Sequence, residues 1–258
     1  MIASYHTHTS RCGHAGDYAD EEFVEAAIAA GFKVIGISDH TPWPYKSDYR
    51  SRMRMDITEL EGYIESVLSM RERYADKIEV KLGLEAEYFP VYMDWLADLR
   101  PRLDYLILGN HFDTSDEQGG IYYGSATTAQ HLETYTDSAI AAMETGLYAF
   151  FAHPDVVFSK FQEFDQYCEE AAHAICEAAA RTNVPLEYNL SGFEKRDNGE
   201  FQGLGYPVPP FWQIASLHPV KATIDLDVHH PRQFHQPERI AEARSYLEGL
   251  GLEIVGMD

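Results

Sequence analysis

Residues 19–40 read ADEEFVEAAIAAGFKVIGISDH, and this stretch decides the fold class. Its first half has a helical pattern, and Gly31 is the residue type that most often follows the end of a helix. The apolar run Lys33–Ser38 comes next and is typical of a short buried strand. Asp39 and His40 follow that run directly, so the predicted strand places two polar side chains at its C-terminal end.

The same alternation of helix and strand continues along the whole chain. We predict strands at the short apolar runs Ile2–Tyr5, Lys33–Ser38, Ile78–Leu84, Tyr105–Gly109, Ala149–Ala152, Pro185–Asn189, Lys221–Asp227 and Glu253–Val255. We predict helices at the amphipathic segments Ala19–Ala30, Ile57–Tyr74, Tyr92–Leu99, Ala129–Thr145, Phe164–Thr182, Pro210–Leu217 and Pro237–Leu250. Seven β/α units without a linker indicate one domain, residues 1–258, with an α/β fold and a closed parallel TIM-like barrel.

Function is expected at one end of such a barrel. Active sites of TIM-like barrels lie at the C-terminal ends of the strands, in the loops that follow them. Two of these loops are long, Thr41–Asp56 and Leu190–Pro209, and both are candidates for a functional role.

The composition indicates the kind of fold and the cellular compartment to expect. With 45% apolar and 13% aromatic residues, the 258-residue chain can bury a full core. It has no apolar run of about 18 residues and no signal-peptide pattern, so we expect neither a membrane span nor secretion. Its three cysteines lack C-x-x-C spacing, which favours a reducing cytoplasm over a disulfide framework. Cys12 is near the candidate site in sequence, but we do not count it among the expected ligands.

The formal net charge of −22 restricts the partners. A nucleic-acid surface needs clustered Lys and Arg side chains, so we expect no nucleic-acid partner. An anionic substrate requires positive charge in the pocket itself. Two or three bound divalent metal ions would supply about four to six positive charges there.

Seven of the twelve histidines and two carboxylates lie at or just beyond the ends of predicted strands. Neutral imidazoles and carboxylates are the ligands that zinc, iron and manganese use in multinuclear sites. The candidate ligands are His6, His8, His14, His40, Glu85, His111, His153, Asp227 and His229. Their shared placement predicts a metal-dependent hydrolase with two to three divalent ions.

Spacing supports individual members of this set. His6 and His8 are two residues apart, so both side chains lie on one face of the first strand. Glu85 and Glu87 have the same relation after the third predicted strand. We choose Glu85 as the bridging ligand and keep Glu87 in reserve. The segment DLDVHH, residues 225–230, repeats the spacing near the C-terminus.

Other catalytic templates are absent from the sequence. The chain contains no G-x-S-x-G elbow, no G-x-x-x-x-G-K-[ST] loop and no G-x-G-x-x-G loop. Serine hydrolases of that type and dinucleotide-binding enzymes are therefore disfavoured.

The order H-x-H, H, D-H, E, H, H, D-x-H resembles the PHP superfamily, named for polymerase and histidinol phosphatase domains, over essentially the full chain. The segments CGHA, SDH-T-P, SRMRM (Ser51–Met55), GLEAEY and NLSG (Asn189–Gly192) are similar to histidinol-phosphate phosphatases. The resemblance implies a distorted (β/α)7 barrel that holds three metals. It implies three ligand sets: His6, His8, Glu85 and Asp227; Glu85, His111 and His153; and His14, His40 and His229.

Two segments depart from the pattern of the family. Relatives often carry a basic residue just after the glycine of the NxxG segment, whereas this chain reads Gly192-Phe193-Glu194. The segment DLDVH replaces a more usual GSDAH. Neither change removes a ligand, but the first alters the charge that lines the pocket.

The expected reaction is hydrolysis of a small phosphomonoester, L-histidinol phosphate in histidine biosynthesis, by a hydroxide that bridges two metals. Arg52 is expected to clamp the phosphate through its bidentate guanidinium. Asp39 either moves a proton or orients a ligand. The expected substrate-binding residues are Arg52, Arg54, Asn189, Lys195, Arg196 and His230.

Three alternatives stay open. The first is a PHP-type phosphoesterase for a nucleotide, an oligonucleotide or phosphotyrosine. The second is an amidohydrolase, although those commonly use a carboxylated lysine after strand four and residues 109–111 (Gly-Asn-His) contain none. The third is a non-catalytic metal-binding domain. The sequence leaves open the identity of the metal and the oligomeric state.

Overall fold

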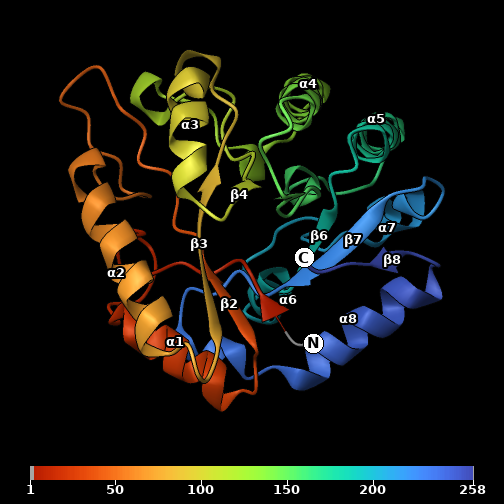
Figure 1. Ribbon diagram of the computed structural model, residues 1–258. Coiled ribbons are helices and arrows are strands. Elements are labelled where there is room, and N and C mark those ends of the chain that lie inside the picture. The colour runs from red at the N-terminus through yellow and green to blue at the C-terminus, as the bar shows by residue number, and fades with distance from the viewer. Residues whose placement is uncertain (1–2, 258) are drawn as a thin grey trace. The chain divides into compact units, whose positions relative to one another are not determined.

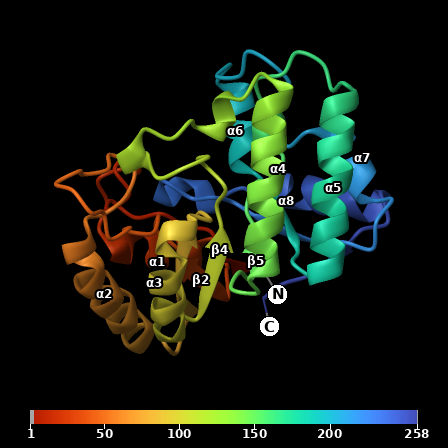
Figure 2. The same ribbon diagram turned by 90° about the horizontal axis from the view of Figure 1, so that it is seen from above.

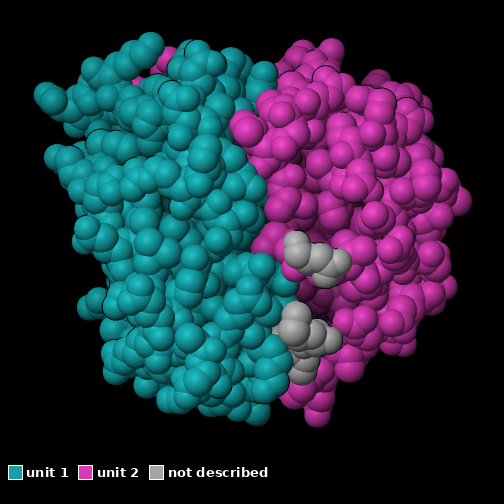
Figure 3. Space-filling view, viewed as in Figure 1, with its two compact units in different colours: residues 1–107, 225–236 teal, residues 108–224, 237–258 magenta. Residues whose placement is uncertain are grey.

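The computed structural model describes residues 3–257, and helices alternate with strands along that range (Figure 1). The chain divides into two compact units, which Figure 3 shows in different colours. Unit 1 comprises residues 1–107 and 225–236, and unit 2 comprises residues 108–224 and 237–258. Each unit combines helices with parallel strands, so the predicted α/β class is confirmed.

Unit 1 contains three parallel strands that pair in chain order. Its elements are β1 (Ala3–Ser4), α1 (Asp20–Ala29), β2 (Val34–Ile37), α2 (Leu60–Arg73), β3 (Glu79–Ala86) and α3 (Met93–Leu99), and β4 (Tyr105–Leu108) follows where the chain passes to unit 2. Val34 of β2 lies opposite Ala3 of β1 and Glu79 of β3. Helix α2 contacts β3, and its buried face includes Ile64 and Val67, three residues apart.

The side chain of Tyr105 packs against three strands of unit 1. A Cβ on Gly36 of β2 would come within 2.0 Å of the Tyr105 hydroxyl oxygen, and one on Gly83 of β3 within 2.4 Å of the same ring. The Tyr105 hydroxyl donates to the Tyr5 carbonyl just after β1. Glycine at both positions therefore makes room for a ring that spans three strands.

Unit 2 repeats the same kind of arrangement. Its strands are β5 (Phe150–Phe151), β6 (Leu186–Asn189), β7 (Lys221–Asp225) and β8 (Glu253–Ile254), with β5 parallel to β6 and β7 parallel to β8. Its helices are α4 (Ala129–Glu144), α5 (Gln166–Thr182), α6 (Ser191–Asp197), α7 (Pro209–Ala215) and α8 (Pro237–Gly249). Helices α4 and α5 lie side by side in both views (Figures 1 and 2). Asp165 caps α5 by accepting from the amides of Tyr167 and Cys168.

The structure confirms the eight predicted strands and seven predicted helices, with ends that shift by a few residues. Ile2 of the first predicted strand lies outside the described residues. Strand β3 continues to Ala86, so Glu85 lies inside the strand rather than after it. The single-domain organisation stays a prediction. No helix within residues 3–257 is long and apolar enough to cross a membrane.

One element contradicts the sequence prediction. Helix α6 lies inside Leu190–Pro209, which was predicted as a loop. It has seven residues, too few to show a helical period in the sequence. It begins directly after β6, where the Asn189 Oδ1 accepts from the Ser191 amide at 2.9 Å.

Candidate metal centre

The segment after β1 places two imidazoles on one side of an extended backbone. Thr7 forms a parallel bridge with Val228, and its carbonyl accepts from the Ser38 amide at 2.8 Å. This backbone points His6 and His8 in the same direction, as side chains two residues apart do in a strand. Both histidines are buried, and their ring centroids are 5.1 Å apart.

Asp227 joins the pair from a distant part of the sequence. The Val228 amide donates to the His6 carbonyl at 3.0 Å, and the His8 amide donates to the Val228 carbonyl at 2.7 Å. Asp227 has a φ of 51°, in the left-handed region that costs a non-glycine residue of order 1 kcal/mol or more. Backbone strain of this kind is concentrated at functional sites.

Glu85 and His40 reach the same place from β3 and from the end of β2. The two residues form a parallel bridge, and the Glu85 amide donates to the Asp39 carbonyl at 3.0 Å. The His40 Nδ1 lies 3.0 Å from the Glu85 Oε2. Both side chains are buried.

The distances between these donors fit a metal better than direct hydrogen bonds. Nε2 of His6 is 3.4 Å from Glu85 Oε1 and 3.5 Å from Asp227 Oδ1. Nε2 of His8 is 3.4 Å from Glu85 Oε2 and from Asp227 Oδ1. Two ligands that are each about 2.0–2.1 Å from a tetrahedral zinc lie about 3.3–3.4 Å apart. The ligand atoms of His6, His8 and Asp227 lie within 4.8 Å of one another and fit one divalent ion, and Glu85 is next to both imidazoles.

Electrostatics favour the neutral form of His8 and the ionised form of Asp227. Burial lowers the pKa of His8, more than the nearby Asp227 and Glu85 carboxylates raise it. Burial alone would raise the pKa of Asp227, but the imidazoles of His6, His229 and His8 hold it well below its usual range. A neutral imidazole and an ionised carboxylate are the metal-binding states of these side chains.

His14 and His229 extend the cluster toward solvent. Their Nε2 atoms are 3.0 Å apart, and His14 is exposed. The ring of His229 stacks on that of His8 with centroids 4.3 Å apart, and the ring of His40 is 4.5 Å from His8. The structure thus brings seven of the nine predicted ligands together within unit 1, with the inner ones buried and the outer ones accessible.

Two buried aspartates hold the backbone that carries these ligands. Asp39 accepts from the amide of Thr9 at 2.7 Å and from its hydroxyl at 2.5 Å. Burial raises the pKa of Asp39 to about 6. Asp225 accepts from the Ser4 hydroxyl at 2.7 Å and from the Tyr5 amide at 2.6 Å. Sequence reasoning missed Asp225, although its two-residue spacing from Asp227 was a usable signal.

The arginines of the loop after β2 have different surroundings. Arg54 is buried and donates to both carboxylate oxygens of Glu87 at 3.0 Å, and the Trp43 indole also donates to Glu87, at 2.9 Å. These contacts argue against Arg54 as a phosphate clamp and Glu87 as a metal ligand. Arg52 is exposed, and its backbone lies against Gly13, where a Cβ would meet the Arg52 carbonyl oxygen at 2.0 Å. Arg52 is therefore next to the turn that carries His14.

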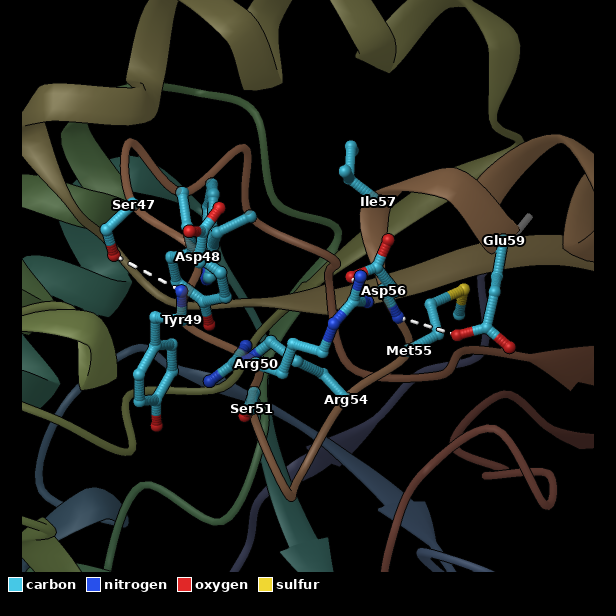
Figure 4. A pocket seen from close by; sticks show the side chains of 12 residues that line it. Ser47, Asp48, Tyr49, Arg50, Ser51, Arg54, Met55, Asp56, Ile57 and Glu59 are labelled. Carbon is cyan, nitrogen blue, oxygen red and sulfur yellow. Dashed lines mark hydrogen bonds and ion pairs between the residues drawn. The ribbon is translucent and has the colours of Figure 1, made fainter.

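The same loop forms a cavity of about 530 Å³ (Figure 4). Its aromatic lining is Trp43, Tyr45 and Tyr49, and its acidic lining is Asp48, Asp56 and Glu59. Arg50, Arg54 and several small or apolar side chains complete the wall. The Asp56 amide donates to Glu59 at 2.7 Å, which fixes the far end of the loop at the start of the next helix.

Both ring nitrogens of His230 are hydrogen-bonded to neighbours. Its Nδ1 accepts from the Arg232 amide at 3.2 Å, so the proton of the neutral ring is on Nε2. That Nε2 lies 2.5 Å from the Tyr18 hydroxyl and donates to it.

The remaining predicted residues lie in unit 2. His111 and His153 are buried with ring centroids 5.1 Å apart, and His153 has a φ of 34°. The buried Glu187, which sequence reasoning missed, accepts from the His153 amide and from the Asn189 side chain, both at 2.8 Å. The two basic residues of α6 are engaged as well. Lys195 donates to the Tyr206 hydroxyl at 2.7 Å, and Arg196 donates to the Pro207 carbonyl at 3.1 Å.

The structure is an α/β protein with a buried cluster of imidazoles and carboxylates that could hold divalent metal. The sequence pattern of the PHP domain matches residues 4–191. Because this match covers more than half of the chain, the protein belongs to the PHP domain family, as the sequence predicted.

Individual relatives agree with this assignment. The chain is 26% identical to the "Probable histidinol-phosphatase" of Deinococcus radiodurans over 94% of its own length and 93% of the relative. The histidinol phosphate phosphatase of Lactococcus lactis, solved with zinc, L-histidinol and phosphate, superposes with a TM-score of 0.72 at 19% identity, covering 99% of this chain and 95% of that one. The "putative histidinol phosphatase hisK" of Listeria monocytogenes also superposes with a TM-score of 0.72 at 19% identity, covering 93% of this chain and 99% of that one. The distorted TIM-like fold of the PHP type is thereby confirmed.

Proposed function

We propose that the protein is a metal-dependent phosphomonoesterase that hydrolyses L-histidinol phosphate to L-histidinol and phosphate. The observation that carries this proposal is the cluster of His6, His8, Glu85 and Asp227, in which each imidazole Nε2 lies 3.4–3.5 Å from an oxygen of each carboxylate. Support comes from the relative of Deinococcus radiodurans named "Probable histidinol-phosphatase", which this chain matches over 93% of that relative's length.

The proposed centre holds two to three divalent ions. The first set is His6, His8, Glu85 and Asp227; the second is Glu85, His111 and His153; the third is His14, His40 and His229. All ligands of the first and third sets belong to unit 1, whereas His111 and His153 are assigned by the sequence resemblance. When bound, such ions lower the pKa of water and neutralise charge on a phosphoryl group.

The side chains around the metals would hold the ester. Arg52 is exposed beside the turn that carries His14, so it is the proposed phosphate contact. Lys195 and Arg196 are proposed as further contacts. Asp39 accepts two hydrogen bonds from Thr9, which favours an orienting role over proton transfer.

The cavity of the loop after β2 favours a cationic leaving group. Carboxylates of Asp48 and Glu59 and the rings of Tyr45 and Tyr49 line it, whereas its two arginines are paired, Arg50 with Asp56 and Arg54 with Glu87. Aromatic faces and carboxylates both attract an ammonium or imidazolium group. L-Histidinol carries such groups, whereas a nucleotide would bring further negative charge into an acidic cavity.

Phosphate release from a panel of esters, measured together with metal content, tests the proposal. We expect two to three metals per chain. We also expect a kcat/KM for histidinol phosphate at least about 100-fold above that for AMP or phosphotyrosine, which corresponds to a difference of about 2.7 kcal/mol in transition-state free energy. Activity on another ester would reassign the substrate and keep the phosphatase. A chain that binds metal and hydrolyses no phosphomonoester would overturn the proposal.

A further inference from the structure

Cys12 lies inside the donor cluster although the sequence did not include it among the ligands. The residue is fully buried. Its Sγ is 3.3 Å from the Nδ1 of His14 and 3.6 Å from the Nε2 of the same ring. Cys168 and Cys176, by contrast, are buried in the apolar face of α5, far from any of the predicted ligands in sequence.

The position of Cys12 is fixed by the backbone around it. Its amide donates to the Thr9 carbonyl at 3.0 Å, and its carbonyl accepts from the Ala15 amide at 2.9 Å. Thr9 is in turn bound through its amide and hydroxyl to the buried Asp39. The thiol is therefore held in a closed turn between two candidate ligands, His8 and His14.

Two separate groups of donors include this sulfur. The ligand atoms of His8, Cys12 and His40 all lie within 4.8 Å of one another, and so do those of Cys12, His14 and His229. His8 is buried, and its Nδ1 has no hydrogen-bond partner among the described residues. The cluster thus has a buried imidazole donor close to the sulfur as well as the two outer imidazoles.

The sulfur is close to His14, but it lies over the face of that ring. A sulfur at about 2.3 Å and a nitrogen at about 2.0–2.1 Å from a tetrahedral zinc lie about 3.6 Å apart. The Cys12 Sγ is 3.6 Å from the His14 Nε2 and 3.3 Å from the Nδ1, so the exposed His14 ring has to turn for both residues to bind one metal. The His14 and His229 Nε2 atoms are 3.0 Å apart, slightly closer than the about 3.3 Å expected for two nitrogens on one zinc.

We propose that the Cys12 thiolate is a ligand of the metal held by His14, His40 and His229. The inference rests on the metal centre of the proposed function. Binding would release the thiol proton to solvent as the Sγ–metal bond forms, with no change in oxidation state. The ligand atoms of His14 and His229 lie within 4.8 Å of the sulfur in one group and that of His40 in the other, and cysteine with histidine is a common ligand combination for tetrahedral zinc. A soft thiolate would also make this position select zinc over manganese.

Cobalt substitution tests the sulfur bond without using activity. The full chain loaded with Co²⁺ should show a thiolate-to-cobalt charge-transfer band in the near ultraviolet. The band should be lost in Cys12→Ala and kept in Cys176→Ala, a matched substitution of a buried cysteine outside the centre. X-ray absorption of the zinc-loaded protein should show a Zn–S distance of about 2.3 Å. In zinc binding, Cys12→Ala should lose at least about 10-fold in affinity at one site, with a smaller loss for manganese.

The outcomes separate this inference from the proposed function. Metal-loaded protein with no charge-transfer band and no Zn–S distance would overturn the role of Cys12 even if phosphatase activity were full. Metal–sulfur bonding in a chain that hydrolyses no phosphomonoester would support the ligand and refute the function. If Cys12→Ala does not fold by circular dichroism, the zinc X-ray absorption of the unsubstituted protein decides alone.

Discussion

Single buried carboxylates position the ligands of this protein. Asp225 accepts hydrogen bonds from the side chain of Ser4 and the backbone of Tyr5, so it fixes the chain immediately before His6. A buried donor that loses its acceptor costs about 1–3 kcal/mol. Asp225 therefore contributes to the metal centre without being one of its ligands.

Asp225→Ala should lower the free energy of unfolding by about 3 kcal/mol, because it leaves the Ser4 hydroxyl and the Tyr5 amide buried without an acceptor. Urea denaturation followed by circular dichroism measures this loss. Asp225→Asn keeps one carbonyl oxygen at the same position and should lose less. Equal stability of both variants and the parent would contradict the anchoring role.

Arg52 and Arg54 are two residues apart, yet the structure separates their roles. Arg54→Ala leaves the Glu87 carboxylate buried without its cation and should cost about 3–5 kcal/mol of folding free energy. Arg52→Ala, at an exposed position, should leave the melting temperature nearly unchanged and raise KM for the phosphoester about 10-fold or more, through loss of a charge-assisted contact. Thermal denaturation and steady-state kinetics on both variants provide the comparison. A large KM effect from Arg54→Ala with unchanged stability would reverse the assignment.

At the scale of elements, the alternation of helix and strand was predictable because each element carries its own period and its own end signals. Residues after strands, such as His6, His40 and Asp227, were therefore placed correctly from sequence spacing alone. The pairing of Arg54 with Glu87 was not predictable, because it joins a loop to the residue just after β3, 33 positions away in the sequence. Helix α6 was not predicted because its seven residues are too few to show the periodic spacing of apolar residues that marks a helix.

The turn that carries Cys12 and His14 depends on one such long-range contact. Asp39→Ala removes both acceptors of Thr9 and should loosen this turn, with a loss of about 10- to 100-fold in affinity for the metal at His14 and His229. Metal at His6 and His8 should be retained. Competition titration with a chromophoric chelator resolves the two classes of site. Asp39→Asn keeps one acceptor oxygen, so its metal affinity should be closer to that of the parent protein. Unchanged metal affinity in Asp39→Ala would mean that the turn holds its shape without Asp39.

At the scale of the whole chain, unit 1 is assembled from two segments, residues 1–107 and 225–236. The bridge between Thr7 and Val228 and the hydrogen bonds of Asp225 join them. The proposed ligands come from both segments, His6 and His8 from one and Asp227 and His229 from the other. Bound metal would thus act as a crosslink across a long stretch of sequence, and it would offset part of a net charge of −22.

Removal of the metal should therefore destabilise the folded chain as a whole. A ligand present at 100 times its dissociation constant adds about 2.7 kcal/mol of stability, and 1 kcal/mol shifts Tm by about 2–4 °C in a protein of this size. Chelation should then lower Tm by about 5–10 °C, measured by calorimetry, and added zinc should restore it. Asp227→Asn should reduce this shift, whereas Asp197→Asn, at an exposed position in α6, should preserve it. Identical melting with and without chelator, once elemental analysis shows that the metal has gone, would mean that the two segments are held by protein contacts alone.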